Sequence, residues 1–318
     1  MAKYIGRRLL VAIPLLFVIS ILVFMLMKAS PYDVVDTMID PKMSAETVAA
    51  IRAKYGLDKP VIVQYFNWLG GILQGDFGYS IATKQSIGQQ LQVRIPATIM
   101  LVLPSYLVAY VLSIVLGLVA GSNRGGRADH VIDGIASVLI AVPTFWLSML
   151  FIFVFGYLLR LLPISGMSTV GDGSAADVAA HYVMPFVTLV IAFLPDNIRY
   201  VRSSTITQSS QDYVMVQEAF GATRAEILFH HVCRNILGPV LTKLGMALPM
   251  LVTGAVITET IFSWPGVGPY FMTAVKGMDY PVVMAILILS STLVILGNLL
   301  ADILNAIADP RIRQGVTE

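Results

Sequence analysis

Six long apolar runs constrain the fold of this chain more than any other feature of its sequence. They cover residues 9–27, 97–121, 131–159, 183–198, 240–262 and 282–308. A helix of about 20 apolar residues is long enough to cross the hydrocarbon core of a bilayer. Only 13% of the residues are charged, whereas soluble domains carry about 25%. The sequence therefore predicts an all-α membrane protein with six transmembrane helices, the third of them broken near Pro143.

The lysines and arginines that flank these runs predict how the chain is oriented. The segments expected inside the cell carry Lys3, Arg7, Arg8, Arg124, Arg127, Arg199, Arg202, Arg224, Arg234, Arg311 and Arg313. The two short outer loops carry only Arg160 and Lys276. Because short cytoplasmic loops are enriched in Lys and Arg, we expect a plasma (inner) membrane protein with both termini in the cytoplasm. Residues 28–30 are a poor cleavage site, so we expect the first helix to be retained.

Residues 29–95 are polar and rich in turn signals, which predicts a small folded insertion on the outer side. Ser44 is placed to cap a helix that ends near Tyr55, and Pro60 is placed to begin a second one. The predicted organisation has three parts. These are the cytoplasmic N-terminus and first helix (1–28), the insertion (29–95) and a five-helix permease-like core (96–318).

A polar, helix-prone segment, residues 208–239, separates the fourth and fifth apolar runs. Gly221 and Ala222 are expected to divide it into two short amphipathic helices. The apolar residues of its second half recur near the helical period, at Ile227, Leu228, Val232 and Ile236. Tethered on both sides to membrane spans, this segment is either a hairpin lying on the membrane surface or a docking surface for a soluble partner.

Motif searches give no indication of catalysis, metal binding or cofactor binding on this chain. The sequence lacks GxxxxGK[ST], so no P-loop for ATP is expected. It also lacks GxSxG and HExxH, and its four histidines are scattered. Cys233, the only cysteine, is expected to be a packing residue. The basic residues are explained by the membrane topology, so no nucleic-acid partner is expected.

Several short motifs, in a fixed order along nearly the whole chain, carry a resemblance to a known family. They are YIGRRLL (4–10), YGLDKP (55–60), GDFGYS (75–80), PAT (96–98), PTFW (143–146), FSWPGVG (262–268), DYPVV (279–283) and DPRIR (309–313). Together they resemble the permease subunits of the dipeptide/oligopeptide/nickel branch of binding-protein-dependent ABC importers. The resemblance implies a type I importer permease that forms a translocation path with a second, homologous permease.

The same resemblance implies a role for residues 208–239, because in that family this cytoplasmic loop docks on an ATPase subunit. The family pattern is Glu-Ala-Ala, three residues and Gly. Gly221 fits the glycine, but Met215 to Gln217 stand where Glu-Ala-Ala would be, and Glu218 comes three residues late. Which acidic residue contacts the ATPase therefore stays open. The candidate coupling residues are Asp212, Tyr213, Glu218, Ala219, Phe220, Gly221, Ala222 and Arg224.

The resemblance further implies one or two ATP-binding subunits, which would hold ATP and Mg²⁺, and an extracytoplasmic solute-binding protein. The expected substrates are di- or oligopeptides, and nickel or a metal chelate is the alternative within the same class. An ion-driven secondary transporter would predict inverted repeats and charges at the membrane midplane, and an intramembrane enzyme would predict a catalytic pair within the spans. Neither pattern is evident in the sequence. The residues that bind substrate are not indicated.

Overall fold

The computed structural model describes residues 2–29, 43–54, 56–236, 240, 243 and 255–308. Within these ranges the regular secondary structure is helical, apart from one isolated β-bridge between Tyr79 and Ser86. Most of the expected fifth run, the end of segment 208–239 and the motif at 309–313 lie outside the described residues.

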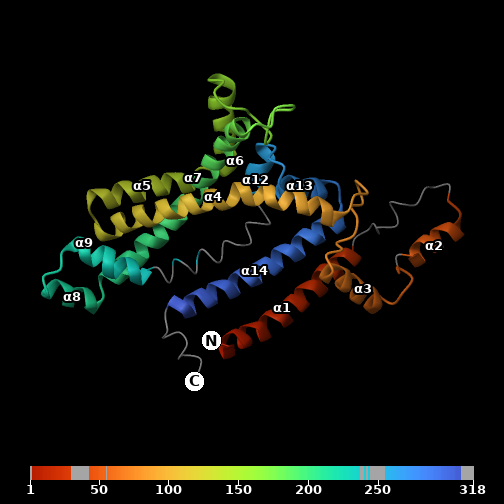
Figure 1. The fold of residues 1–318 in the computed structure, drawn as a ribbon, viewed down its shortest axis with the longest axis horizontal. Helices are drawn as coiled ribbons and strands as arrows, with labels where there is room; N and C mark the ends of the chain where they lie inside the picture. Colours follow the sequence, from red (N-terminus) through yellow and green to blue (C-terminus); the bar gives the residue numbers. More distant parts are fainter. Residues whose placement is uncertain are drawn as a thin grey trace.

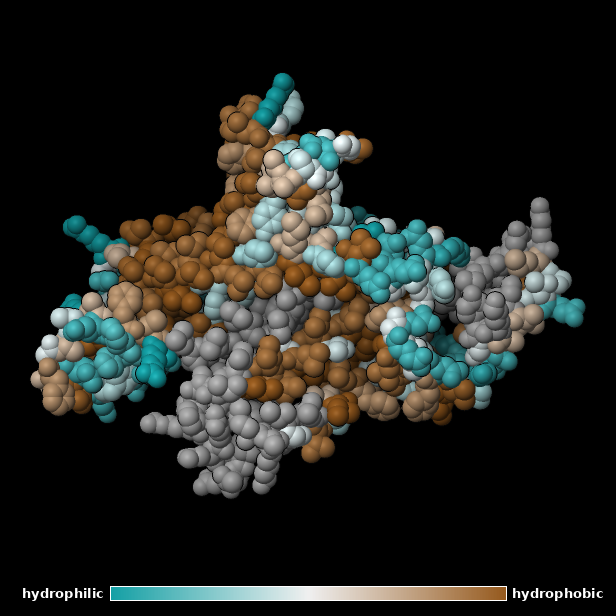
Figure 2. Space-filling model, viewed as in Figure 1, coloured by the Kyte–Doolittle hydropathy of each residue, from teal (hydrophilic) through white to brown (hydrophobic). Residues whose placement is uncertain are grey.

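Four of the described helices are long and apolar enough to cross a membrane. They are α1 (Ala2–Lys28), α4 (Ile87–Ser122), α7 (Ala175–Ser209) and α14 (Tyr280–Ala308). The most extensive helix pairing joins α4 to α7, and α1 lies beside α14 (Figure 1). Hydrophobic side chains cover α4, α14 and α5 (Arg127–Ala141) (Figure 2). Hydrophilic ones surround α8 (Asp212–Ala219), α9 (Arg224–Glu226) and the loop that joins α3 (Val61–Leu73) to α4. This distribution is that of a multi-pass membrane protein.

The third apolar run is broken into two helices at Pro143, as predicted from the sequence. It consists of α5 (Arg127–Ala141), α6 (Thr144–Phe151) and a π-helical continuation, η1 (Ile152–Leu158). The two halves meet at 90°. Proline disfavours helical geometry in the residue before it, and Val142 is extended, with φ −86° and ψ 116°. If this bent pair is one span, the described residues hold five membrane-spanning candidates.

The long helices extend beyond the apolar runs from which they were predicted. Helix α4 begins at Ile87 rather than Ala97, so its first residues belong to the expected insertion. Helix α7 covers Ala175–Ser209, although its apolar run covers only 183–198. Hydropathy marks only the part of a helix suited to lipid, whereas Gln, Arg and Ser residues continue the helix where water is available. The apolar runs therefore mark the expected spans and underestimate the full length of these two helices.

The predicted helices between the first two spans are present as α2 (Ala45–Lys54) and α3 (Val61–Leu73). The Ser44 hydroxyl accepts a hydrogen bond from the backbone N–H of Thr47 at 3.2 Å, as expected of a cap. Helix α3 packs on α1, where the hydroxyls of Tyr65 and Ser20 lie 2.7 Å apart. The Tyr65 ring also contacts Phe24 edge to face, so this aromatic residue fixes α3 on the first membrane helix.

Two further described helices are α12 (Val256–Ile261) and α13 (Val267–Lys276). They adjoin the loops near the start of α4. A buried cluster there combines residues of α4, α13 and α14, namely Ile87, Leu91, Val267, Tyr270, Ala274, Val282, Ala285 and Ile286. This end of the molecule therefore has an apolar core of its own, which shares no residue with the buried cluster that contains Val214, Ile227 and Val232 of segment 208–239.

Candidate functional site

Segment 208–239 contains two helical pieces separated at Gly221, as the sequence predicted. The first is α8 (Asp212–Ala219), and the second is α9 (Arg224–Glu226) with its π-helical continuation η2 (Ile227–Val232). Gly221 has φ +82°, in the left-handed region that glycine tolerates best. Its conformation ends α8 sharply and sets the angle at which the second piece departs.

A reciprocal cap begins the second piece and stiffens the junction. The Thr223 hydroxyl accepts a bond from the Glu226 N–H at 3.3 Å, and the Glu226 carboxylate accepts one from the Thr223 N–H at 2.7 Å. The Thr223 hydroxyl also donates to this carboxylate at 2.8 Å, and the bonds donated by the Thr223 backbone and hydroxyl lower the pKa of the Glu226 carboxyl. Thr223 was not singled out from the sequence, although its Thr-x-x-Glu spacing is the recognised signal of a capping box.

The predicted apolar face of the segment is buried against the long helices, although part of it is π-helical rather than α-helical. Ile227, Val232 and Ile236 are almost fully buried, and Leu228 and Cys233 pack against them. Their partners on α4 and α7 are Tyr106, Tyr110, Leu118 and Val201. Burying such side chains contributes about 1.5–3 kcal/mol each. The second half of the segment therefore packs against the long helices and does not project freely from them.

Two further contacts attach residues just beyond the segment to α4 and α7. The Tyr110 hydroxyl donates to the Val240 carbonyl. The Lys243 ammonium donates to the Asp196 carbonyl at 3.2 Å and lies 4.7 Å from the centre of the Tyr200 ring. A cation over an aromatic face is attracted by the ring quadrupole. Lys243 is thus held on α7.

Most of the candidate coupling residues lie on the exposed side. Asp212, Glu218, Ala219, Phe220, Gly221 and Arg224 are exposed, whereas Tyr213 and Ala222 are half-buried against the core. Phe220 stands out because 84% of its surface is exposed. Three other exposed apolar residues of the segment, Met215, Val216 and Phe229, were not among the candidate coupling residues. The side of the segment that faces away from α4 and α7 therefore presents several large apolar side chains.

Motifs that are distant in the sequence meet on the far side of the molecule. The Trp264 indole N–H donates to the Ala97 carbonyl at 2.8 Å, and the Val267 N–H donates to the Thr98 hydroxyl at 2.9 Å. The FSWPGVG and PAT motifs therefore form one packed unit. The fully buried Glu259 accepts a bond from the backbone N–H of Gly268 within the same unit.

A second contact between motifs involves Asp279 at the start of α14. Its buried carboxylate accepts bonds from the Ser80 hydroxyl and from the backbone N–H groups of Ile81 and Ala82. The GDFGYS loop is thereby fixed to the DYPVV motif. Within the described ranges, no group of three His, Cys, Asp or Glu side chains could hold a metal ion.

Long apolar helices carrying a rigid, polar two-helix segment define the class as multi-pass helical membrane proteins. Comparison with known sequences gives the family. The family described as "Binding-protein-dependent transport system inner membrane component" matches residues 113–314. The family of N-terminal regions of such membrane components matches residues 1–102. The chain therefore belongs to the family of binding-protein-dependent transport system inner membrane components, which are transport permeases.

Several relatives are similar over almost their whole length. The oligopeptide transport system permease protein AppB of Bacillus subtilis is 39% identical over 98% of this chain and 99% of its own. The di/tripeptide transport system permease protein DppB of Pseudomonas aeruginosa is 34% identical over the same shares. The dipeptide transport system permease protein DppB of Escherichia coli is 33% identical, also over 98% and 99%. The resemblance to the peptide branch is thus confirmed.

Proposed function

We propose that this chain is a permease subunit of an ATP-driven type I importer for di- or oligopeptides. It forms the translocation path together with a second, homologous permease. The named functions of three relatives that are 33–39% identical support the peptide substrate. The proposed coupling to ATP hydrolysis is supported by the packing of segment 208–239 against α4 and α7.

The segment serves as the docking site for an ATPase subunit. One or two ATP-binding subunits hold ATP and Mg²⁺, and this chain carries no cofactor. When the ATPases close on ATP, they move the docked segment. Its buried face passes the movement to α4 and α7, because a well-packed interface moves as a unit. The path between the two permeases, which was open to one side of the membrane, then opens to the other side.

The proposed topology has six spans, with both termini and segment 208–239 in the cytoplasm. Residues 1–28 form the N-terminus and first helix, residues 96–318 form the five-helix core, and 29–95 form an insertion on the outer side. There the insertion meets the solute-binding protein that delivers the substrate. The distribution of Lys and Arg supports this orientation. In a Cys233→Ser background, Glu218→Cys is expected to react with impermeant thiol reagents only from the cytoplasmic face.

Gly221 provides the sharpest test of docking. A Cβ added there would meet nothing within 4 Å, so a large side chain projects into the space where the partner is expected. Gly221→Trp should uncouple ATP hydrolysis from peptide uptake in vesicles that contain the complete transporter. Gly221→Ala is the matched control, because it carries the same backbone strain at φ +82° without the bulk. Wild-type ATP-dependent uptake by the Trp variant would contradict docking at this position.

A nickel or metal-chelate importer remains the alternative within this family, because the binding protein selects the substrate. The binding protein that co-purifies with the complex can be analysed for its ligand. A bound peptide indicates a peptide importer, and a bound metal or chelate indicates a metal importer. An ion-driven transporter is the alternative from another class. It predicts that the chain reconstituted alone transports substrate without ATP.

A further inference from the structure

The backbones of α4 and α7 approach each other unusually closely beside segment 208–239. A Cβ added at Gly117 would lie 2.6 Å from the Cβ of Val201, and one at Gly121 would lie 2.5 Å from the Cβ of Thr205. Small residues allow such close packing of membrane helices. Because segment 208–239 is buried against the same two helices, these three elements form one rigid unit.

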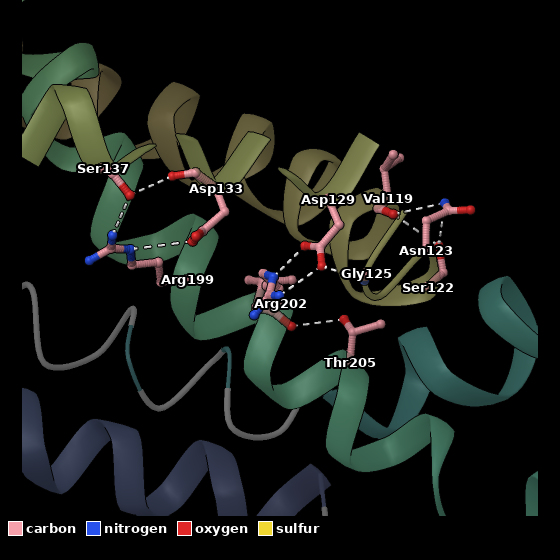
Figure 3. A network of polar contacts seen from close by, with 11 residues as sticks. Val119, Ser122, Asn123, Gly125, Asp129, Asp133, Ser137, Arg199, Arg202 and Thr205 are labelled. Carbon is pink, nitrogen blue, oxygen red and sulfur yellow. Dashed lines mark hydrogen bonds and ion pairs between the residues drawn. The ribbon is translucent and has the colours of Figure 1, made fainter. Parts of the chain in front are cut away.

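Helix α5 is fixed to this unit by a charged pair (Figure 3). The Arg202 guanidinium of α7 donates to both carboxylate oxygens of Asp129 on α5, at 2.5 and 2.8 Å. The Asp129 side chain is only 3% exposed, and it also accepts a bond from the Gly125 N–H at 2.9 Å. A bidentate pair of this kind fixes orientation as well as distance. The loop between α4 and α5 is thereby held in the same network.

A second, weaker link lies further along α5 on the same face (Figure 3). The Arg199 guanidinium lies 3.7 Å from the Asp133 carboxylate and donates to the Ser137 hydroxyl at 2.8 Å. Both side chains of that ion pair are 45% exposed. Exposed pairs contribute little, about 0–1 kcal/mol. The two arginines therefore provide a strong and a weak link between the same two helices.

Helix α5 leads directly to the bend at Pro143 and to α6. Helix α6 in turn contacts α12, the helix next to the FSWPGVG motif. The Arg202–Asp129 pair is thus the stronger of the two polar links between the rigid unit around segment 208–239 and the bent pair α5–α6, and it adds to the direct packing of α5 and α6 on α7.

We propose that Arg202 and Asp129 are positioning residues that make the bent pair α5–α6 move together with segment 208–239. This proposal rests on the proposed function, in which an ATPase displaces that segment. With the pair intact, α5 follows the displacement of α7. Without the pair, α5 moves less than α7, so α6 and α12 are displaced less in each ATP-driven cycle.

The test removes both charges together, because removal of one partner leaves an unpaired buried charge that destabilises the fold. The variant is Asp129→Asn combined with Arg202→Gln, and the matched control is Arg199→Gln, on the exposed link. Both are assembled into the complete transporter, and ATP hydrolysed per peptide imported is measured. We expect the double variant to raise this ratio about fivefold or more, the lower range of typical coupling. The control should keep the wild-type ratio.

A distance measurement separates this role from a merely structural one. Spin labels at Arg127→Cys on α5 and Ser210→Cys, an exposed residue between α7 and α8 outside the candidate coupling residues, report in a Cys233→Ser background whether the two elements move together. The label distance should stay constant on ATP addition with the native pair, and it should shift in the double variant. A double variant that matches Arg199→Gln in both ratio and distance would overturn the proposal. Failure of docking itself appears independently, as ATP-coupled uptake that survives Gly221→Trp.

Discussion

The close approach of α4 and α7 gives a quantitative prediction at Gly121. An added methyl group there lies 2.5 Å from the Cβ of Thr205, whereas ordinary contact begins at 3.4 Å, so the helices must separate by about 0.9 Å. Such overpacking costs about 1–3 kcal/mol. Replacing glycine by alanine inside a helix also stabilises the helix by about 0.5–1 kcal/mol. A control variant must therefore show the same gain without the overpacking.

Gly134→Ala on α5 is that control, because a Cβ at Gly134 meets nothing within 4 Å. Both variants gain helix propensity, and only Gly121→Ala is overpacked. The midpoint of thermal unfolding of the transporter in nanodiscs should therefore be lower for Gly121→Ala than for Gly134→Ala, by several degrees. Unfolding of large membrane assemblies is commonly irreversible, so one scan rate is used throughout. Equal midpoints would refute the inferred close packing of the two helices.

Two further predictions concern the opposite end of the molecule. Trp264→Phe should lower the unfolding midpoint, because it leaves unfilled volume and removes a hydrogen bond to the Ala97 carbonyl, worth about 0.5–1.5 kcal/mol. The control is Trp146→Phe, which changes a half-exposed tryptophan and should have little effect on the midpoint. Equal losses in the two variants would contradict the assigned contact. Asp279→Asn replaces an acceptor oxygen by a donor facing the Ser80 loop, so amide hydrogen exchange of residues 80–82 should accelerate. Unchanged exchange would show that the carboxylate does not hold the loop.

The helical break at Gly221 and the buried stripe of the following helix could both be predicted. Glycine tolerates positive φ, and apolar side chains at the helical period mark the buried face; both are local properties of the sequence. The exposed Phe220 could be nominated as a coupling residue only through the family resemblance. The role of Asp279 could not be foreseen, because its partners lie at residues 80–82, and no local pattern connects them.

The amino-acid sequence is enough to predict an all-α membrane protein, the end of α8 and the break in the third apolar run. These features depend on the length of apolar runs and on the backbone restrictions of glycine and proline, which act over a few residues. The pairing of α4 with α7, and the contact between Arg202 and Asp129 across 73 residues, could be seen only in the folded molecule. Such pairings depend on which faces fit closely once the helices are assembled, and neither hydropathy nor residue spacing encodes that fit.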